Sequence, residues 1–316
     1  MARPTLSDSE FIEMFRALGA AGMSRKTGMS ERGLYARRAR LEQKMQKPVR
    51  AETGHLNVKE GPEEHPGRLL FDVPDGVVLV ASDAHYWPGI VTTAHKAFVR
   101  FCRVMKPKLV IMNGDVLDGA TVSRHAPIGW ESRPKLTDEI DACKARLFEI
   151  EKVTKNVPKV WTLGNHDARF ETRLATVAPE YAKVNGIHLK DHFPDWESCW
   201  SAWVSDQLVV KHRNKSGIHA PHNNTMWAGK SIATGHLHSL KVMPVTDYNG
   251  TRWGVDTGTL AEPGGPQFLN YLEDGATNWR SGFAVFTFRG GRLMWPEVVS
   301  VVSDGVVDFR GELIDV

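Results

Sequence analysis

Residues 109–118 read Leu-Val-Ile-Met-Asn-Gly-Asp-Val-Leu-Asp, an apolar run that ends abruptly in polar and acidic residues. Residues 77–85, Val-Val-Leu-Val-Ala-Ser-Asp-Ala-His, have the same form. Short apolar runs of this kind predict buried strands of a sheet that is covered on both faces. The polar residues after each run then lie at the carboxyl edge of the sheet, where α/β proteins place their sites. These segments therefore predict an α/β fold with a site at the ends of neighbouring strands.

The pattern continues on both sides of these two runs. We expect further strands at residues 159–163, 207–210, 232–234, 254–257, 283–288 and 298–302, and amphipathic helices at 94–105 and 138–154. Strands and helices alternate early in this region, and strands dominate late. That order favours an α/β sandwich with a mixed sheet over a simple doubly wound fold.

Five of the predicted strand ends carry side chains that bind metal ions. On an extended strand, Asp-x-His and His-x-His place alternate side chains on one side, so each pair is expected to converge. Mixed carboxylate and imidazole donors suit Mn, which we favour, or Fe, Zn or Ni, rather than Ca. Seven donors exceed one tetrahedral ion and suit two divalent ions about 3.5–4 Å apart, the arrangement used for phosphoryl displacement. The candidate ligands are Asp83, His85, Asp115, Asn165, His212, His236 and His238.

His212 depends on a single strand, residues 208–210, which it directly follows. His219 and His222 lie in the same stretch of chain and are the alternatives.

The order and spacing of these motifs resemble those of the calcineurin-like metallophosphoesterases. The motifs that carry the resemblance are Asp83-x-His85, Gly114-Asp115-x-x-Asp118, Gly164-Asn165-His166-Asp167, His212 and Gly235-His236-x-His238. The resemblance implies a four-layer α/β-β/α sandwich with two metals at one sheet edge. It implies that Asp83, His85 and His238 hold the first metal, that Asp115 bridges, and that Asn165, His212 and His236 hold the second.

Three more residues take roles from the same resemblance. His166 would face the substrate and protonate the leaving oxygen or stabilise charge, while the metals activate the attacking water. Asp167, beside it, would orient or charge that imidazole. Asp118 would support a metal ligand by hydrogen bonding rather than bind metal itself.

Substrate contacts are expected from Arg124, His125 and Arg169, which follow these motifs, unless they are ordinary surface charges. Gly119 stands where the Ser/Thr phosphoprotein phosphatases carry an Arg, and Asp167 where they commonly carry Glu. Both departures argue against a protein phosphatase. The loop at 262–279 could form a rim or lid over the site, or be a long connection.

Residues 1–46 are expected to form a small helical domain, followed by a linker at 47–75 and the sandwich at 76–316. Ser7 with Glu10 makes a capping box, Gly19 and Gly22 break the first helix, and Ser30 caps a last helix at 31–45. Residues 23–45 resemble a helix-turn-helix, although a protein-binding or oligomerisation module of three helices has a similar pattern. The candidate DNA contacts are Arg25, Lys26, Arg32, Tyr35 and Arg38.

Charge supports a polyanion as partner. Residues 1–50 hold 11 Lys and Arg against 5 Asp and Glu, a balance of +6, although the whole chain carries only +3. Such asymmetry is typical of contact with nucleic acid. A helix-turn-helix joined to this site also resembles bacteriophage metallophosphoesterases, as do residues 114–125 and 282–286.

The sequence therefore predicts a dimetal phosphoesterase, acting as a phosphodiesterase or nuclease on DNA. The alternatives are a phosphomonoesterase or small-nucleotide phosphodiesterase, and a non-catalytic DNA-binding protein on the same fold. Three separated cysteines suit a reducing compartment. No apolar run of 18 residues and no secretory pattern occurs, so no membrane partner and a cytoplasmic location, in a bacterial host if phage-encoded, are expected.

Overall fold

A computed structural model of the chain describes residues 6–47, 49, 67–181, 184–272 and 275–316. The chain divides into two compact units, residues 1–64 and residues 65–316, hereafter the N-terminal unit and the larger unit. The predicted linker at 47–75 falls mostly outside the described residues. Within the described residues, no helix has the length and apolar character needed to cross a membrane.

The N-terminal unit consists of two helices packed around a small apolar core. Helix α1 (Asp8–Thr27) begins at the predicted capping box, and α2 (Glu31–Met45) begins at Ser30. Gly19 bends α1 through a non-helical backbone, with φ 62°. The predicted break at Gly22 is wrong, because the helix continues through it. One glycine costs a helix only about 1 kcal/mol, which the packing of the adjacent Met23 into the core offsets.

The larger unit contains two sheets that pack face to face. The first has the strand order β15-β14-β13-β11-β2-β3-β4-β5, with β12 beside β11, and the second has the order β1-β6-β7-β8-β10-β9. The strands of the first sheet are β2 (Gly76–Ala81), β3 (Leu109–Met112), β4 (Lys159–Thr162), β5 (Glu197–Cys199), β11 (Gly282–Arg289), β12 (Arg292–Leu293), β13 (Glu297–Ser303), β14 (Val306–Phe309) and β15 (Glu312–Asp315). The strands of the second sheet are β1 (Leu69–Phe71), β6 (Ala202–Val204), β7 (Leu208–Val210), β8 (Ser231–Thr234), β9 (Lys241–Asp247) and β10 (Gly250–Asp256).

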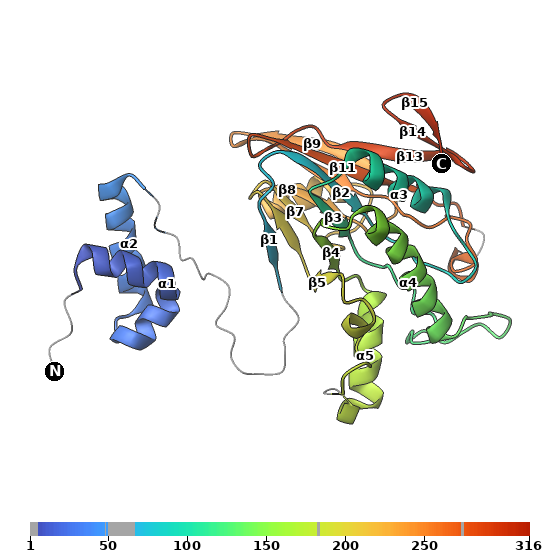
Figure 1. The fold of residues 1–316 in the computed structure, drawn as a ribbon, viewed down its shortest axis with the longest axis horizontal. Helices are drawn as coiled ribbons and strands as arrows, with labels where there is room; N and C mark the ends of the chain where they lie inside the picture. The colour runs from blue at the N-terminus through green and yellow to red at the C-terminus, as the bar shows by residue number, and fades with distance from the viewer. Residues whose placement is uncertain (1–5, 48, 50–66, 182–183, 273–274) are drawn as a thin grey trace. The chain divides into compact units, whose positions relative to one another are not determined.

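Helices pack on the outer faces of the two sheets, giving four layers. Figure 1 shows helices α3 (Thr93–Met105) and α4 (Leu136–Val153) beside the first sheet, and α6 (Ala220–Ala228) contacts the second. The remaining helical segments are α5 (Asp167–Val177), α7 (Leu269–Leu272), η1 (Pro179–Tyr181) and η2 (Leu189–His192). The expected mixed α/β sandwich is therefore confirmed.

Alternation along the central strands explains the two cores. On β2, Val78 and Val80 face the second sheet, whereas Leu79 and Ala81 face α3 and α4. Successive side chains of a strand point to opposite faces, and both faces of this sheet are buried. The short runs at 77–81 and 109–112 are apolar throughout for this reason.

Strand β1 corrects the predicted linker. Leu69–Phe71 pairs in parallel with Ala202–Val204 of β6, at the edge of the second sheet. The pairing joins segments more than 130 residues apart, and three residues carry too little local pattern to reveal it.

Candidate metal centre

The loops that follow β2, β3 and β8 turn sharply where the strands end. Asp83, His85, Asp115, His236 and His238 all have positive φ, between 38° and 72°. This region is strained for residues with a side chain, by about 1 kcal/mol or more each, and such residues cluster at functional sites. The expected convergence of Asp-x-His and His-x-His is therefore present, but its assumed cause is wrong. The pairs meet because the backbone curls, not because an extended strand alternates.

Two glycines allow these loops to approach one another. A Cβ on Gly164 would lie 2.0 Å from Oδ1 of Asp115, and one on Gly235 would lie 2.5 Å from Oδ2 of Asp83. Any side chain at either position would displace a carboxylate. The glycine in each of these motifs is thus required by contact between loops that are distant in sequence.

Six of the seven candidate ligands fall into two groups of three. The ligand atoms of Asp83, His85 and His238, the first trio, all lie within 4.8 Å of one another. Those of Asp115, His212 and His236, the second trio, satisfy the same limit. The division agrees with the one that the resemblance implies. His212 lies in the cluster, whereas His219 and His222 are exposed at the start of α6.

Four buried side-chain atoms that could bind metal in this cluster make no hydrogen bond within the described structure: Nε2 of His85, Nε2 of His212, Nδ1 of His238 and Oδ1 of Asn165. In each imidazole the other ring nitrogen has a hydrogen-bond partner. Nδ1 of His85 lies 2.9 Å from Oδ1 of Asp118, and Nδ1 of His212 lies 2.8 Å from the Asn113 carbonyl oxygen. A proton on Nδ1 leaves the Nε2 lone pair of His85 free, which is the state that binds metal. Nε2 of His212 lies 3.1 Å from Oδ2 of Asp115. Burial opposes a second proton on His212, but Asp115 and Asp83 outweigh it and raise its pKa to about 10. Leaving such atoms unpaired costs about 1–3 kcal/mol each, so the donor set fits cations.

The carboxylates of the cluster are held in their charged form. Burial opposes ionisation of Asp83, but the imidazoles of His238 and His212 outweigh it and lower its pKa. Burial likewise opposes ionisation of Asp115, and His212 and His166 lower its pKa. Two buried anions beside several imidazoles form a site prepared for positive charge. Two divalent ions here would activate water and neutralise charge on a phosphate.

His166 lies at the N-terminal end of α5, beside the cluster but outside both trios. Its Nδ1 lies 2.8 Å from the Asp118 carbonyl oxygen, and its Nε2 lies 3.0 Å from a guanidinium nitrogen of Arg169. Nδ1 therefore carries the proton here, and Nε2 accepts from Arg169. Burial opposes a second proton, but Asp115 and Asp118 outweigh it and raise the pKa of His166. Nε2 also lies 4.0 Å from Oδ2 of Asp115, which places the imidazole at the edge of the second trio.

Asp118 connects the two imidazoles. Its Oδ1 lies 2.9 Å from Nδ1 of His85 and 3.2 Å from Nδ1 of His166. Asp118, His85 and His166 also form a third group whose ligand atoms lie within 4.8 Å of one another, so the supporting role that the sequence suggested for Asp118 stays a prediction.

Asp167 does not orient or charge the His166 imidazole, and that expectation is corrected. Its carboxylate is fully buried and accepts four backbone hydrogen bonds and one from the Trp161 indole. Three of the backbone donors belong to Asp115, Val116 and Leu117. Burial raises its pKa to about 6, and these donors act in the opposite direction. Asp167 is a positioning residue that shapes the loop carrying Asp115.

The predicted substrate contacts divide in the same way. Arg169 lies at the site, where it also donates to the Asp118 carbonyl oxygen at 3.0 Å. Arg124 and His125 are exposed, and neither belongs to a group of candidate metal ligands among the described residues. Spacing along the chain could not show this difference in exposure.

Several residues near the cluster were not singled out from the sequence. Phe268 and Trp279, from the loop suspected of forming a rim, pack against His85 and His238. Arg213, directly after His212, is close enough to lower the pKa of His236 together with burial and His212. Carboxylates elsewhere hold the loops: Glu139 accepts from the backbone of residues 119 and 120, and Asp256 from the backbone and hydroxyl of Ser239. Glu139 lies in the first turn of a helix, where acidic residues are common, so the sequence did not indicate that it holds the loop at residues 119 and 120.

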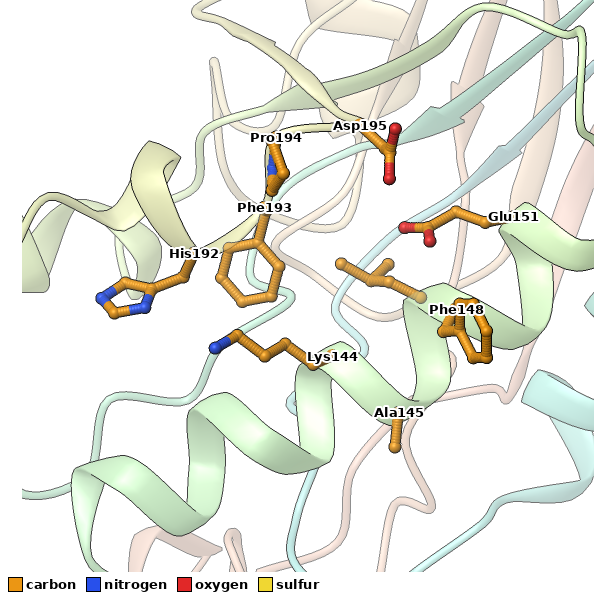
Figure 2. Close-up of a pocket in the computed structure, with 9 residues that line it drawn as sticks. Lys144, Ala145, Phe148, Glu151, His192, Phe193, Pro194 and Asp195 are labelled. Carbon is orange, nitrogen blue, oxygen red and sulfur yellow. The ribbon is translucent and has the colours of Figure 1, made fainter. Parts of the chain in front are cut away.

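A separate hollow of about 370 Å³ lies between α4 and the segment after η2 (Figure 2). Lys144, Phe148, His192 and Phe193 are among its lining residues. None of the candidate ligands borders it, so it is distinct from the metal cluster.

Comparison with known proteins bears directly on this site. A family model described as calcineurin-like phosphoesterase matches residues 76–269, which include every ligand candidate. Gene 54 protein of Mycobacterium phage L5 is 25% identical over 231 residues, 66% of this chain and 87% of that protein, and Gene 54 protein of Mycobacterium phage D29 is 26% identical over the same shares. A Saccharomyces cerevisiae protein serine/threonine phosphatase is 13% identical and covers 76% of this chain and 85% of its own, at a TM-score of 0.37, too low to add to the argument. The match of the family model over more than half of the chain shows that this protein belongs to the calcineurin-like phosphoesterases, metal-dependent hydrolases of phosphate esters that use two metal ions.

Proposed function

We propose that this chain is a phosphodiesterase that cleaves DNA and uses Mn as its metal. We further propose that the N-terminal unit binds the DNA backbone without sequence specificity. The observation that carries the proposal is a group of exposed cations around the turn between α1 and α2. Arg25 and Lys26 lie in the last turn of α1, Arg32 lies in the first turn of α2, and all three are exposed. Phosphate contacts from such side chains supply most of the affinity of sequence-independent binding.

The other two predicted DNA contacts differ in availability. Tyr35 is 48% exposed, and its ring meets the edge of Phe15. Arg38 is engaged within the unit, because its guanidinium lies over the rings of Phe15 and Tyr35 and 3.5 Å from Glu42. We therefore assign the DNA backbone contacts to Arg25, Lys26 and Arg32.

The larger unit supplies further positive charge beside the metal cluster. Arg169 touches His166, Arg213 follows His212, and Arg280 is bonded through its backbone nitrogen to the His238 carbonyl oxygen at 2.7 Å. Guanidinium groups bind non-transferred phosphate oxygens by paired hydrogen bonds. A polymeric diester carries such phosphates on both sides of the scissile bond, and a small monoester does not.

The variant R25A/K26A/R32A tests whether these three cations bind DNA. We expect roughly ten- to hundred-fold lower kcat/KM on a duplex oligonucleotide with Mn at low salt, and a salt dependence shallower by about two to three units of log–log slope. Hydrolysis of bis(p-nitrophenyl) phosphate should not change. The matched variant K96A/R103A/K152A removes the same charge from exposed helical positions of the larger unit, and should behave as wild type.

Other outcomes favour the alternatives. An oligonucleotide left intact by an enzyme that hydrolyses p-nitrophenyl phosphate would point to a phosphomonoesterase. Oligonucleotide binding without hydrolysis of any ester would point to a DNA-binding protein. If kcat/KM fell equally on DNA and on the small diester, the triple variant would have damaged the fold and not DNA binding alone.

H166A tests the proposed general acid. We expect kcat to fall about a hundredfold on an alkyl ester, because the variant lacks the imidazole that can protonate the leaving oxygen once Nε2 takes up a second proton in place of the hydrogen bond from Arg169. The loss on a p-nitrophenyl ester should be much smaller, since nitrophenolate leaves without a proton. Metal content should remain that of wild type, and H222A, which removes an exposed imidazole of α6, is the control. The same loss on both esters would argue for a structural role.

A further inference from the structure

Two aromatic side chains form a wall beside the first trio. Phe268 is 5% exposed, and its ring centroid lies 5.1 Å from that of His85 and 5.6 Å from that of His238. Trp279 lies 4.4 Å from His238 and 5.0 Å from Phe268, again between ring centroids. The rings of a candidate metal ligand, of Phe268 and of Trp279 are thus in mutual contact.

The two rings differ in how they meet solvent. Phe268 is buried and packs behind Trp279, whereas Trp279 itself is half-buried. A large aromatic surface that remains accessible next to a polar site is suited to contact with a ligand.

The position of Trp279 is held by the site itself. The next residue, Arg280, donates from its backbone nitrogen to the His238 carbonyl oxygen at 2.7 Å, and its carbonyl oxygen accepts from Thr259 at 3.2 Å. Ser281 then donates from its hydroxyl to the Ala261 carbonyl oxygen at 2.7 Å. The backbone that follows Trp279 is therefore hydrogen-bonded to the loop of the first trio, and the indole lies against a candidate metal ligand.

We propose that Trp279, backed by Phe268, forms a stacking subsite for a planar ring carried by the phosphate ester. The chemistry fits a nucleobase or a simple aryl group, because each has a π face and sits a short distance from its phosphate. Stacking of a base on an aromatic side chain contributes about 1–3 kcal/mol and tolerates any base sequence. The inference rests on the proposed function and narrows its substrate to esters that bear a ring.

Binding to the Mn-loaded full chain tests the subsite without turnover. The probes are thymidine 5′-monophosphate, phenyl phosphate and methyl phosphate, titrated by calorimetry. Wild type should bind the two ring-bearing probes roughly five- to 150-fold more tightly than methyl phosphate. W279A should reduce that ratio to below about twofold, with the affinity of each variant for methyl phosphate as its own reference, and W279F should keep most of the ratio. Trp227, 74% exposed on α6, provides the matched control W227A, which should keep the wild-type ratio.

Each outcome decides the proposal. A wild type that binds all three probes alike, or a W279A that retains the preference, would overturn it. If both ring-bearing probes bind more tightly than methyl phosphate, the subsite accepts any aryl group. If only thymidine 5′-monophosphate binds more tightly, the subsite is specific for a nucleoside. If the binding ratio is present but a dinucleotide is not cleaved, the phosphodiesterase function fails while the subsite stands.

Discussion

D115N is expected to lower kcat/KM on every phosphate ester by about a thousandfold or more. Oδ1 of Asp115 accepts from the backbone nitrogen of His166 at 2.8 Å, so the oxygen of an asparagine would take that place. The amide NH₂ would then face Nε2 of His212, which lies 3.1 Å from Oδ2 in the wild type. A donor would thus occupy the position of a metal-binding oxygen, and a negative charge would be lost. Effects of metal on phosphoryl transfer amount to several kcal/mol, and about 1.4 kcal/mol corresponds to a tenfold change in rate.

Metal binding provides a second measurement for this variant. An ion that binds only the folded state raises stability in proportion to its affinity, so Mn should raise the melting temperature of wild type much more than that of D115N. D247N makes the same change at the β9–β10 hairpin, where Asp247 pairs with Arg252, and should keep both activity and the Mn response. If D115N retains wild-type activity, the assignment of Asp115 to the metal centre is wrong.

D167N is expected to lower the free energy of unfolding by about 4 kcal/mol. Oδ2 accepts from the backbone nitrogens of Asp115 and Gly164 and from the Trp161 indole, at 2.7–2.9 Å. Oδ1 accepts from the backbone nitrogens of Val116 and Leu117, at 3.0 and 3.1 Å. An amide would direct its NH₂ at two or three of these donors in either orientation. Buried donors that lose their acceptor cost about 1–3 kcal/mol each, and relaxation of the loop limits the sum.

Urea unfolding measures this loss, and metal affinity should fall with it because the same hydrogen bonds shape the loop of Asp115. Asp191 is the matched control, since its exposed carboxylate accepts from the backbone nitrogens of Gly186 and His188 at 2.8 and 3.2 Å. D191N should cost less than about 1 kcal/mol, because water replaces the lost acceptor. A D167N protein with unchanged stability but reduced kcat would instead restore a catalytic role for this residue.

The central strands and their terminal ligands could be predicted because the information is local. Each of the runs at 77–81 and 109–112 is apolar throughout, since both faces of the first sheet are buried, and each is followed directly by ligand candidates. The helices at 94–105 and 138–154 were found within two residues of their ends. Strand β1 and α5 were not found, because the pairing of β1 is non-local and α5 follows a motif interpreted only for its chemistry.

The amino-acid sequence by itself determined the fold class, the family and the candidate ligands, because each rests on residue types at short spacing. Only the tertiary structure decided what the neighbouring polar residues do. Asp167 follows His166 directly in sequence, yet its carboxylate accepts from backbone groups about 50 residues earlier. Trp279 follows His238 by 41 positions, yet the two rings are in contact. Burial and hydrogen bonding between distant loops set these roles, and spacing along the chain does not encode them.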